Sequence, residues 1–151
     1  MSPSPLVIRT AEKADLPTLL SLYRELSPTD PIIDPATADA RFDAMLSHPG
    51  MHVLLGFDDA TAAATVTLVV IPNLTRNGAP YALIENVVTA ARHRKRGYAA
   101  ALIAHAVETA WDAGCYKVML LTGSNDPATL RFYENCGFVQ NKTGFQIRRS
   151  V

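Results

Sequence analysis

The feature that most constrains the fold is a short basic loop that joins a strand-like run to a long helical pattern. The run at residues 81–88 is mostly apolar, the loop reads Arg94-Lys95-Arg96-Gly97-Tyr98-Ala99, and an Ala-rich helical pattern starts at Gly97. A Gly-containing loop between a strand and a helix N-terminus directs several backbone N–H groups at one point, where the helix dipole favours a phosphate. We therefore predict that this loop holds a pyrophosphate; the alternative is an exposed basic turn.

The first half of the chain predicts two helices and three strands. Apolar residues recur at helical spacing over 15–26, and prolines exclude a regular helix over 27–35. A second helix is expected over 35–47, ended by His48-Pro49-Gly50. The strands are expected at 6–9, 51–57 and 62–71, the last two as a hairpin, with a second turn at Asn77-Gly78 leading into 81–88.

The second half predicts an alternation of helices and strands. A helix is expected over 97–113, a strand over 116–121, a short helix from the Asp126-Pro127 cap to Asn135, and a closing strand over 145–148. This order predicts an α/β fold with a central, mostly antiparallel mixed sheet, helices on both faces and one parallel strand–helix–strand crossover.

Composition limits the possible organisation and partners. With 151 residues and 48% hydrophobic content, one domain over 1–151 is expected. Fourteen basic and fourteen acidic side chains cancel, which argues against nucleic-acid or membrane partners, and the basic run at 92–96 lacks interleaved aromatics. Cys115 and Cys136, without an apolar leader, indicate free thiols in a cytoplasmic protein. Because Pro49-Gly50 separates His48 from His52, no metal site is expected.

Two segments together resemble the acyl-CoA-binding core of the GNAT superfamily of N-acetyltransferases. The first is the 94–99 loop, which in that family reads Arg/Gln-x-x-Gly-x-Gly/Ala; the second is residues 125–138, which contains Tyr133 before the pair Gly137-Phe138. The chain departs from the family pattern at Lys95 and Ala99, where glycine is common, and the family's Asn role falls to Asn125 or Asp126.

The resemblance implies acetyl-CoA as acyl donor. The loop would hold the pyrophosphate, and residues 87–89 would hydrogen-bond pantetheine like an added strand, with a backbone N–H near Val88 meeting the acetyl oxygen. The implied coenzyme-binding residues are Val87, Val88, Thr89, Arg94, Lys95, Arg96, Gly97, Tyr98, Ala99, Asn125 and Tyr133.

Two side chains are candidates for the proton transfers of acetyl transfer. Glu85 is the only carboxylate in an otherwise apolar strand and is the expected general base, directly or through a water. A structural alternative is that Glu85 pairs with Arg76 or with a backbone group. By resemblance, Tyr133 is the general acid that gives the departing thiolate its proton; otherwise it is a core aromatic.

The acceptor is expected to be a primary amine of a small molecule. The segments around 84–88, 114–118 and 132–138 look especially like glucosamine-6-phosphate N-acetyltransferases, so an amino-sugar phosphate is a named option. A protein N-acetyltransferase and a non-catalytic acetyl-CoA-binding module are the alternatives, and family resemblance suggests a homodimer. The loops 27–35 and 72–80 are expected to wall the acceptor slot, and the side chains that could line it are Tyr23, Asp30, Asp34, Asn73, Arg76 and Tyr81.

Overall fold

The computed structural model describes residues 5–150, which fall into two compact units, the first reaching to Leu120 and the second starting at Leu121. One domain over 1–151 stays a prediction. The first unit contains β1 (Val7–Thr10), η1 (Lys13–Asp15), α1 (Leu16–Leu26), α2 (Pro35–Ser47), β2 (Met51–Asp58), β3 (Thr61–Ile71), η2 (Arg76–Gly78), β4 (Tyr81–Thr89), η3 (Ala91–His93), α3 (Tyr98–Asp112) and β5 (Val118–Met119); the second contains α4 (Pro127–Asn135).

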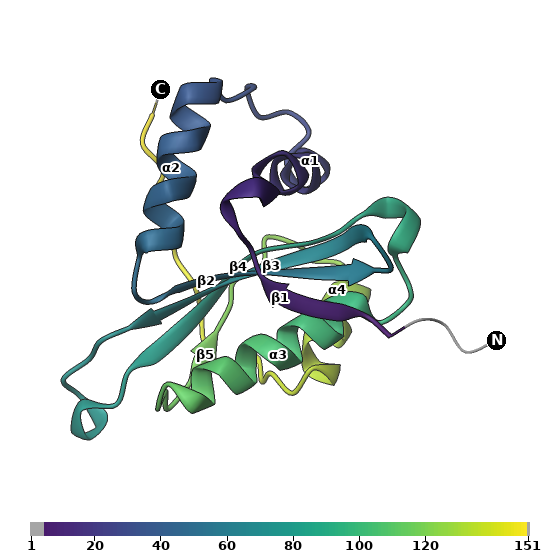
Figure 1. Cartoon of the computed structure of the whole chain (residues 1–151). Helices are drawn as coiled ribbons and strands as arrows, with labels where there is room; N and C mark the ends of the chain where they lie inside the picture. Colours follow the sequence, from purple (N-terminus) through teal and green to yellow (C-terminus); the bar gives the residue numbers. More distant parts are fainter. Residues whose placement is uncertain (1–4, 151) are drawn as a thin grey trace. The chain divides into compact units, whose positions relative to one another are not determined.

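The first unit is built on a mixed sheet in the order β1-β2-β3-β4-β5. The pairs β1–β2, β2–β3 and β3–β4 are antiparallel, whereas β4 and β5 are parallel and are connected through α3. Helices α1 and α2 lie on one face of the sheet and α3 lies on the other (Figure 1). The predicted mixed sheet, its parallel crossover and its helices on both faces are confirmed.

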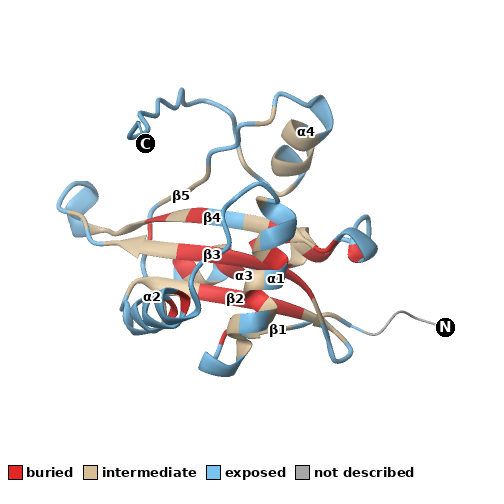
Figure 2. Cartoon of the chain, turned by 90° about the horizontal axis from the view of Figure 1, so that it is seen from above, coloured by how far each residue is buried: buried red, intermediate tan, exposed pale blue. Residues whose placement is uncertain are grey.

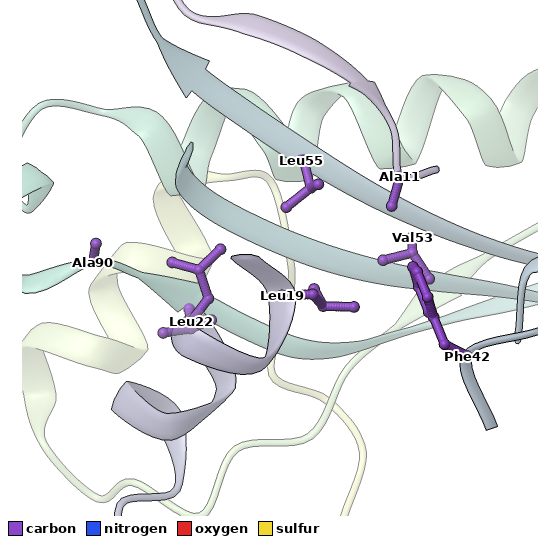
Figure 3. Packing of buried hydrophobic residues seen from close by; sticks show 8 residues of the cluster. Ala11, Leu19, Leu22, Phe42, Val53, Leu55 and Ala90 are labelled. Atoms are coloured by element: carbon purple, nitrogen blue, oxygen red, sulfur yellow. The ribbon is translucent and has the colours of Figure 1, made fainter. Parts of the chain in front are cut away.

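The core under α1 and α2 consists of apolar side chains from helices and strands. Leu19 and Leu22 of α1 and Phe42 of α2 pack with Val53 and Leu55, which alternate along β2 (Figure 3). Strands β2 and β3 contain most of the buried residues of the sheet (Figure 2). The apolar stripe that predicted the first helix is therefore the face that α1 buries.

The ends of α2 follow from local sequence. The Asp34 carboxylate accepts a hydrogen bond from the Thr37 amide at 3.0 Å, and Pro35 occupies the first turn, where no amide partner is needed. After Ser47 the chain turns at Gly50, whose amide donates to His48 Nδ1 at 3.1 Å. A Cβ at Gly50 would lie 2.2 Å from the Val70 carbonyl oxygen, so this close approach of the chain to β3 requires glycine.

Two predicted strands differ from the structure. Only Val118 and Met119 of the segment 116–121 are in a strand, because β5 has β4 as its single neighbour and their pairing ends at Leu83 and Met119. The prediction of a closing strand at 145–148 is wrong: the described residues after Asn135 form no helix or strand. The Phe145 and Ile147 side chains, which suggested a strand, are 92% and 98% exposed.

Candidate active site

Strand β4 changes character halfway along, at a β-bulge. Thr67 of β3 pairs with Glu85 and Thr65 pairs with Val88, so two residues of β4 lie opposite one residue of β3. Asn86, within this bulge, has a φ of 53°, in the left-handed region that Asn tolerates better than most residues. A bulge interrupts the in-and-out alternation of a strand and bends it. As a result, the consecutive residues Glu85 and Asn86 are both exposed.

The structure changes the surroundings expected for Glu85. Its side chain is exposed rather than enclosed by apolar neighbours. Within residues 5–150 it takes part in no salt bridge and no side-chain hydrogen bond, and the suggested partner Arg76 lies over the Tyr116 ring, 5.6 Å from its centroid. Among the described residues, the Glu85 carboxylate therefore makes neither the ion pair nor the backbone hydrogen bond of the structural alternative. Its role as general base stays a prediction.

The end of β4 after the bulge carries the residues predicted to contact pantetheine. Val88 is buried and Val87 and Thr89 are half-buried. The chain remains fixed to β3 beyond this point, because the Ala90 amide donates to the Ala63 carbonyl at 2.8 Å. The structure thus provides a well-anchored strand end next to an exposed bulge.

The loop after β4 leaves backbone donors without partners. Among the described residues, the amides of Lys95, Arg96 and Gly97 donate no hydrogen bond to the protein. Lys95 has a φ of 63° and Gly97 a φ of 79°, and Gly97 is the N-cap of α3 without any side-chain cap. The first-turn amides of an α-helix have no intrahelical acceptor. Free N–H groups therefore follow one another from Lys95 into the first turn of α3, as an anion cradle requires.

The side chains of this loop are exposed from Arg94 to Gly97, whereas Tyr98 is buried and Ala99 is half-buried. Arg94 Nε donates to the Thr89 carbonyl at 3.3 Å, which folds the first basic side chain back along the end of β4. The predicted coenzyme-binding residues from Val87 to Ala99 are thus brought together as one continuous segment in the first unit. Their roles toward a coenzyme stay predictions.

Sequence reasoning named Tyr23 only as a residue that could line the acceptor slot. Its hydroxyl lies 3.4 Å from Thr67 Oγ1, on the β3 residue that pairs with Glu85. Burial raises the pKa of the Tyr23 phenol, against the opposing effect of hydrogen bonds with Thr67 and Asn86. The structure therefore places a neutral phenol of α1 beside the bulge.

The other suggested acceptor-slot residues have different surroundings. Asp34 caps α2. Arg76 lies in η2, before β4, and Tyr81 is the first residue of β4, four residues, or about 13 Å, from Glu85 along the strand. There Lys117 Nζ lies over the rings of Tyr81 and Tyr116, at 5.5 and 5.4 Å from their centroids. The turn at 72–80 thus lies at the opposite end of β4 from the loop.

Two contacts near the loop were not predicted at all. The Glu25 carboxylate of α1 accepts a hydrogen bond from the Ala91 amide at 2.8 Å and borders an open hollow of about 350 Å³. Asp58, at the end of β2, meets both His93 and Arg96. No sequence signal connects residues so far apart, because both contacts depend on the tertiary fold.

The second unit contains the remaining predicted site residues. Tyr133 is half-buried on α4, and its ring lies 5.1 Å from Phe132 and 6.3 Å from Phe138. Burial, and to a lesser extent the charge of Cys136, raises the pKa of the Tyr133 phenol, so it keeps its proton at neutral pH. The Asp126 carboxylate caps α4 through the Ala128 amide at 2.9 Å, whereas Asn125 is exposed.

The two cysteines are poor candidates for a catalytic nucleophile. Cys115 and Cys136 are free, and burial raises the pKa of both thiols, which keeps them protonated and poorly nucleophilic. Within residues 5–150, no cluster of three or more His, Cys, Asp or Glu side chains could hold a metal ion. None of the described helices has the length and apolar character needed to cross a membrane.

Comparison with known proteins identifies the family of this chain. Residues 19–138 match the model of the acetyltransferase (GNAT) family, and the chain belongs to that family. It is therefore an acyltransferase, as predicted from the 94–99 loop and the 125–138 segment.

Several members of the family are similar to this chain over most of its length. The chain is 33% identical over 137 residues to glucosamine 6-phosphate N-acetyltransferase 1 of Oryza sativa subsp. japonica, covering 88% of this chain and 81% of that protein. It is 29% identical to the glucosamine 6-phosphate N-acetyltransferase of Trypanosoma brucei brucei, covering 88% of each. A solved structure from Agrobacterium tumefaciens str. C58, named no more specifically than as an acetyltransferase, has a TM-score of 0.91 at 54% identity, covering 95% of this chain and 99% of that one.

Proposed function

We propose that this enzyme transfers the acetyl group of acetyl-CoA to the primary amine of a small molecule, and that an amino-sugar phosphate is the acceptor. The observation that carries the proposal is the run of unpartnered amides from Lys95 into the first turn of α3, directly after a bulged strand. Backbone donors at a helix N-terminus suit a diphosphate, which every coenzyme A thioester carries. The relatives named for glucosamine 6-phosphate support the choice of acceptor.

In the proposed complex the loop and strand hold the coenzyme in two ways. The amides of Lys95, Arg96 and Gly97 bind the diphosphate, with Tyr98 and Ala99 continuing the cradle and the Arg94 and Lys95 side chains adding positive charge. Val87, Val88 and Thr89 hydrogen-bond pantetheine as an added strand, and an amide near Val88 meets the acetyl oxygen. Asn125 completes the coenzyme-binding set.

The proposed reaction is a direct attack on the thioester. The acceptor nitrogen forms a bond to the acetyl carbon while the carbon–sulfur bond breaks. Glu85, directly or through a water, takes the proton that the amine loses. Tyr133 gives its proton to the departing thiolate, and the raised pKa of its phenol keeps that proton available at neutral pH. The products are an N-acetylated amine and free coenzyme A.

The location and assembly of the enzyme complete the proposal. A cytoplasmic location accords with two free thiols in the chain. A homodimer is proposed from family resemblance, and sedimentation of the full chain tests it.

The experiment that tests the function proceeds in two steps. Acetyl-CoA should raise the melting temperature, because a ligand that binds the native state stabilises it. Release of free coenzyme A thiol is then measured with glucosamine 6-phosphate, glucosamine, an aliphatic diamine, a lysine-containing peptide and a free N-terminal peptide. The proposal expects the largest kcat/KM with glucosamine 6-phosphate and a product heavier by one acetyl group.

Other results separate the alternatives. A preference for either peptide would make the protein a protein N-acetyltransferase. Binding of acetyl-CoA without accelerated thiol release by any amine would contradict the proposed acceptor class.

A further inference from the structure

The basic side chains of the 94–96 loop differ in what they contact. Arg94 folds back onto the Thr89 carbonyl, and Lys95 has no hydrogen bond or salt bridge with any described residue. Arg96 instead reaches away from its own loop, and its Nη1 lies 3.2 Å from Oδ2 of Asp58. Of the three cations, Arg96 is therefore the one with a carboxylate partner.

Asp58 is well placed to hold the loop still. It is the last residue of β2, where it pairs with Thr61 at the tight turn into β3, so its backbone belongs to the central sheet. Its side chain is 18% exposed, whereas the neighbouring Asp59 is an exposed turn residue. A partly enclosed carboxylate interacts more strongly with nearby charges than one surrounded by water.

The same carboxylate oxygen also meets His93, at the other end of the loop. His93 Nδ1 lies 3.5 Å from Asp58 Oδ2, the His93 side chain is only 10% exposed, and neither ring nitrogen has a hydrogen-bond partner among the described residues. A buried imidazole without a hydrogen bond is uncommon in native proteins. His93 and Arg96 flank Arg94 and Lys95, so one oxygen of Asp58 contacts both ends of a four-residue span.

We propose that Asp58 is a positioning residue for the coenzyme loop. By holding Arg96 against the end of β2, beside His93, it keeps the Lys95, Arg96 and Gly97 amides pointing together before the diphosphate arrives. A loop that is ordered in advance loses less conformational freedom on binding, which favours affinity. The Arg96 guanidinium thus acts through Asp58 rather than on the phosphates. This inference depends on the proposed function, because it assumes that the loop binds a coenzyme.

The test measures the dissociation constant of acetyl-CoA by calorimetry and the kinetic constants by thiol release. Asp58→Asn should weaken binding about tenfold, a difference of about 1.4 kcal/mol, and raise KM for acetyl-CoA, with kcat at saturation unchanged. Asp59→Asn is the matched control, since it removes a carboxylate from the same turn, and it should leave the dissociation constant unchanged. Asp58→Glu should restore part of the lost affinity.

A double-mutant cycle separates positioning from direct phosphate contact. If Arg96 acts through Asp58, Arg96→Ala should weaken binding about as much as Asp58→Asn, and the double variant should be no weaker than either single variant. Additive losses would show that Arg96 contacts the coenzyme independently, and this would overturn the inference.

Separate controls distinguish a folding defect, and a failure of the proposed function, from the role of Asp58. Because the Arg96 side chain is 53% exposed, its pair with Asp58 contributes little to stability, and the unliganded variants should melt close to the unmodified protein. If Asp58→Asn does not fold, the dissociation constants of acetyl-CoA are compared between Arg96→Ala and Arg96→Lys. The Arg96→Lys variant is expected to retain more affinity. If the unmodified protein fails to bind acetyl-CoA, the proposed function is wrong; if it binds and Asp58→Asn binds equally well, only the role of Asp58 is wrong.

Discussion

Strand β3 and the neighbouring segment 85–97 belong to the same unit but differ in burial, backbone conformation and hydrogen bonding. From Ala64 to Leu68, β3 is buried on both faces and lies between its antiparallel neighbours β2 and β4. The segment 85–97 contains the left-handed residues Asn86, Lys95 and Gly97, consecutive exposed side chains and amides without acceptors. We infer from this difference that β3 contributes stability, whereas the segment 85–97 leaves its polar groups available for a ligand.

The largest expected effect is on the packed side of this comparison. Leu68→Ala removes a fully buried side chain from β3 and should lower the free energy of unfolding by about 3 kcal/mol. Leu74→Ala, at a side chain that is 95% exposed, is the control and should change it by less than about 0.5 kcal/mol. Urea denaturation measures both, and equal losses would mean that β3 is not the stabilising centre.

The reverse result is expected at the bulge. Glu85→Gln should lower kcat about 100-fold if Glu85 is the general base, while leaving the melting temperature unchanged, because the side chain is exposed and unpaired. Glu108→Gln, at an exposed position of α3, is the matched control. An unaltered kcat in Glu85→Gln would end its assignment as base.

A pH profile extends the comparison to the second unit. Burial raises the pKa of the Tyr133 phenol, so a general acid at this position should lose activity only as pH rises through a value above the usual 10. Tyr133→Phe should lower kcat about 100-fold and remove this alkaline limb. Since the folded-state pKa is raised, the same group lowers folding stability above about pH 10.

The control for that profile is a second phenol. Burial also raises the pKa of Tyr23, so Tyr23→Phe tests whether the alkaline limb belongs to another tyrosine. The limb should persist in Tyr23→Phe. Its loss there, with retention in Tyr133→Phe, would contradict the general-acid assignment.

The smallest expected effect compares two glycines of the same conformation. Gly78 and Gly97 both have a φ of 79°, and a Cβ at either would meet no other atom within 4 Å. Alanine at either position should cost about 1 kcal/mol of stability through left-handed strain. Only Gly97→Ala should also weaken acetyl-CoA binding, about tenfold, because it disturbs the amide cradle. Equal affinities of Gly78→Ala and Gly97→Ala for acetyl-CoA would show that the 94–99 loop does not take part in binding.

The same contrast explains which parts of the molecule could be predicted from sequence. Helix α2 was predicted with its observed ends, since the prolines up to Pro35 and the His48-Pro49-Gly50 turn are strong local signals. The Asp34 cap was not predicted, because Asp34 was considered only as a residue of the acceptor slot. The 94–99 loop was found because its Gly97 lies between a strand and a helix. The bulge at Asn86 was missed, because two exposed residues in a row depend on the pairing with β3 and not on their own propensities.

Long-range polar contacts were also beyond sequence reasoning. Arg96 was expected to bind the coenzyme as part of the 94–99 loop, which stays a prediction, and nothing in the sequence indicated its contact with Asp58, 38 positions away. The segment 145–148 has the alternation of a strand but forms none, since a local pattern does not by itself specify the backbone pairing that a strand needs.

The most direct test of the central claim follows the backbone amides of the loop by NMR during titration with acetyl-CoA. The claim is that the amides of Lys95, Arg96 and Gly97 bind the diphosphate of the coenzyme. Their resonances should move together and saturate at the dissociation constant that calorimetry gives, whereas amides within β3 stay in place. Saturable binding of acetyl-CoA with these three resonances unmoved would contradict the account.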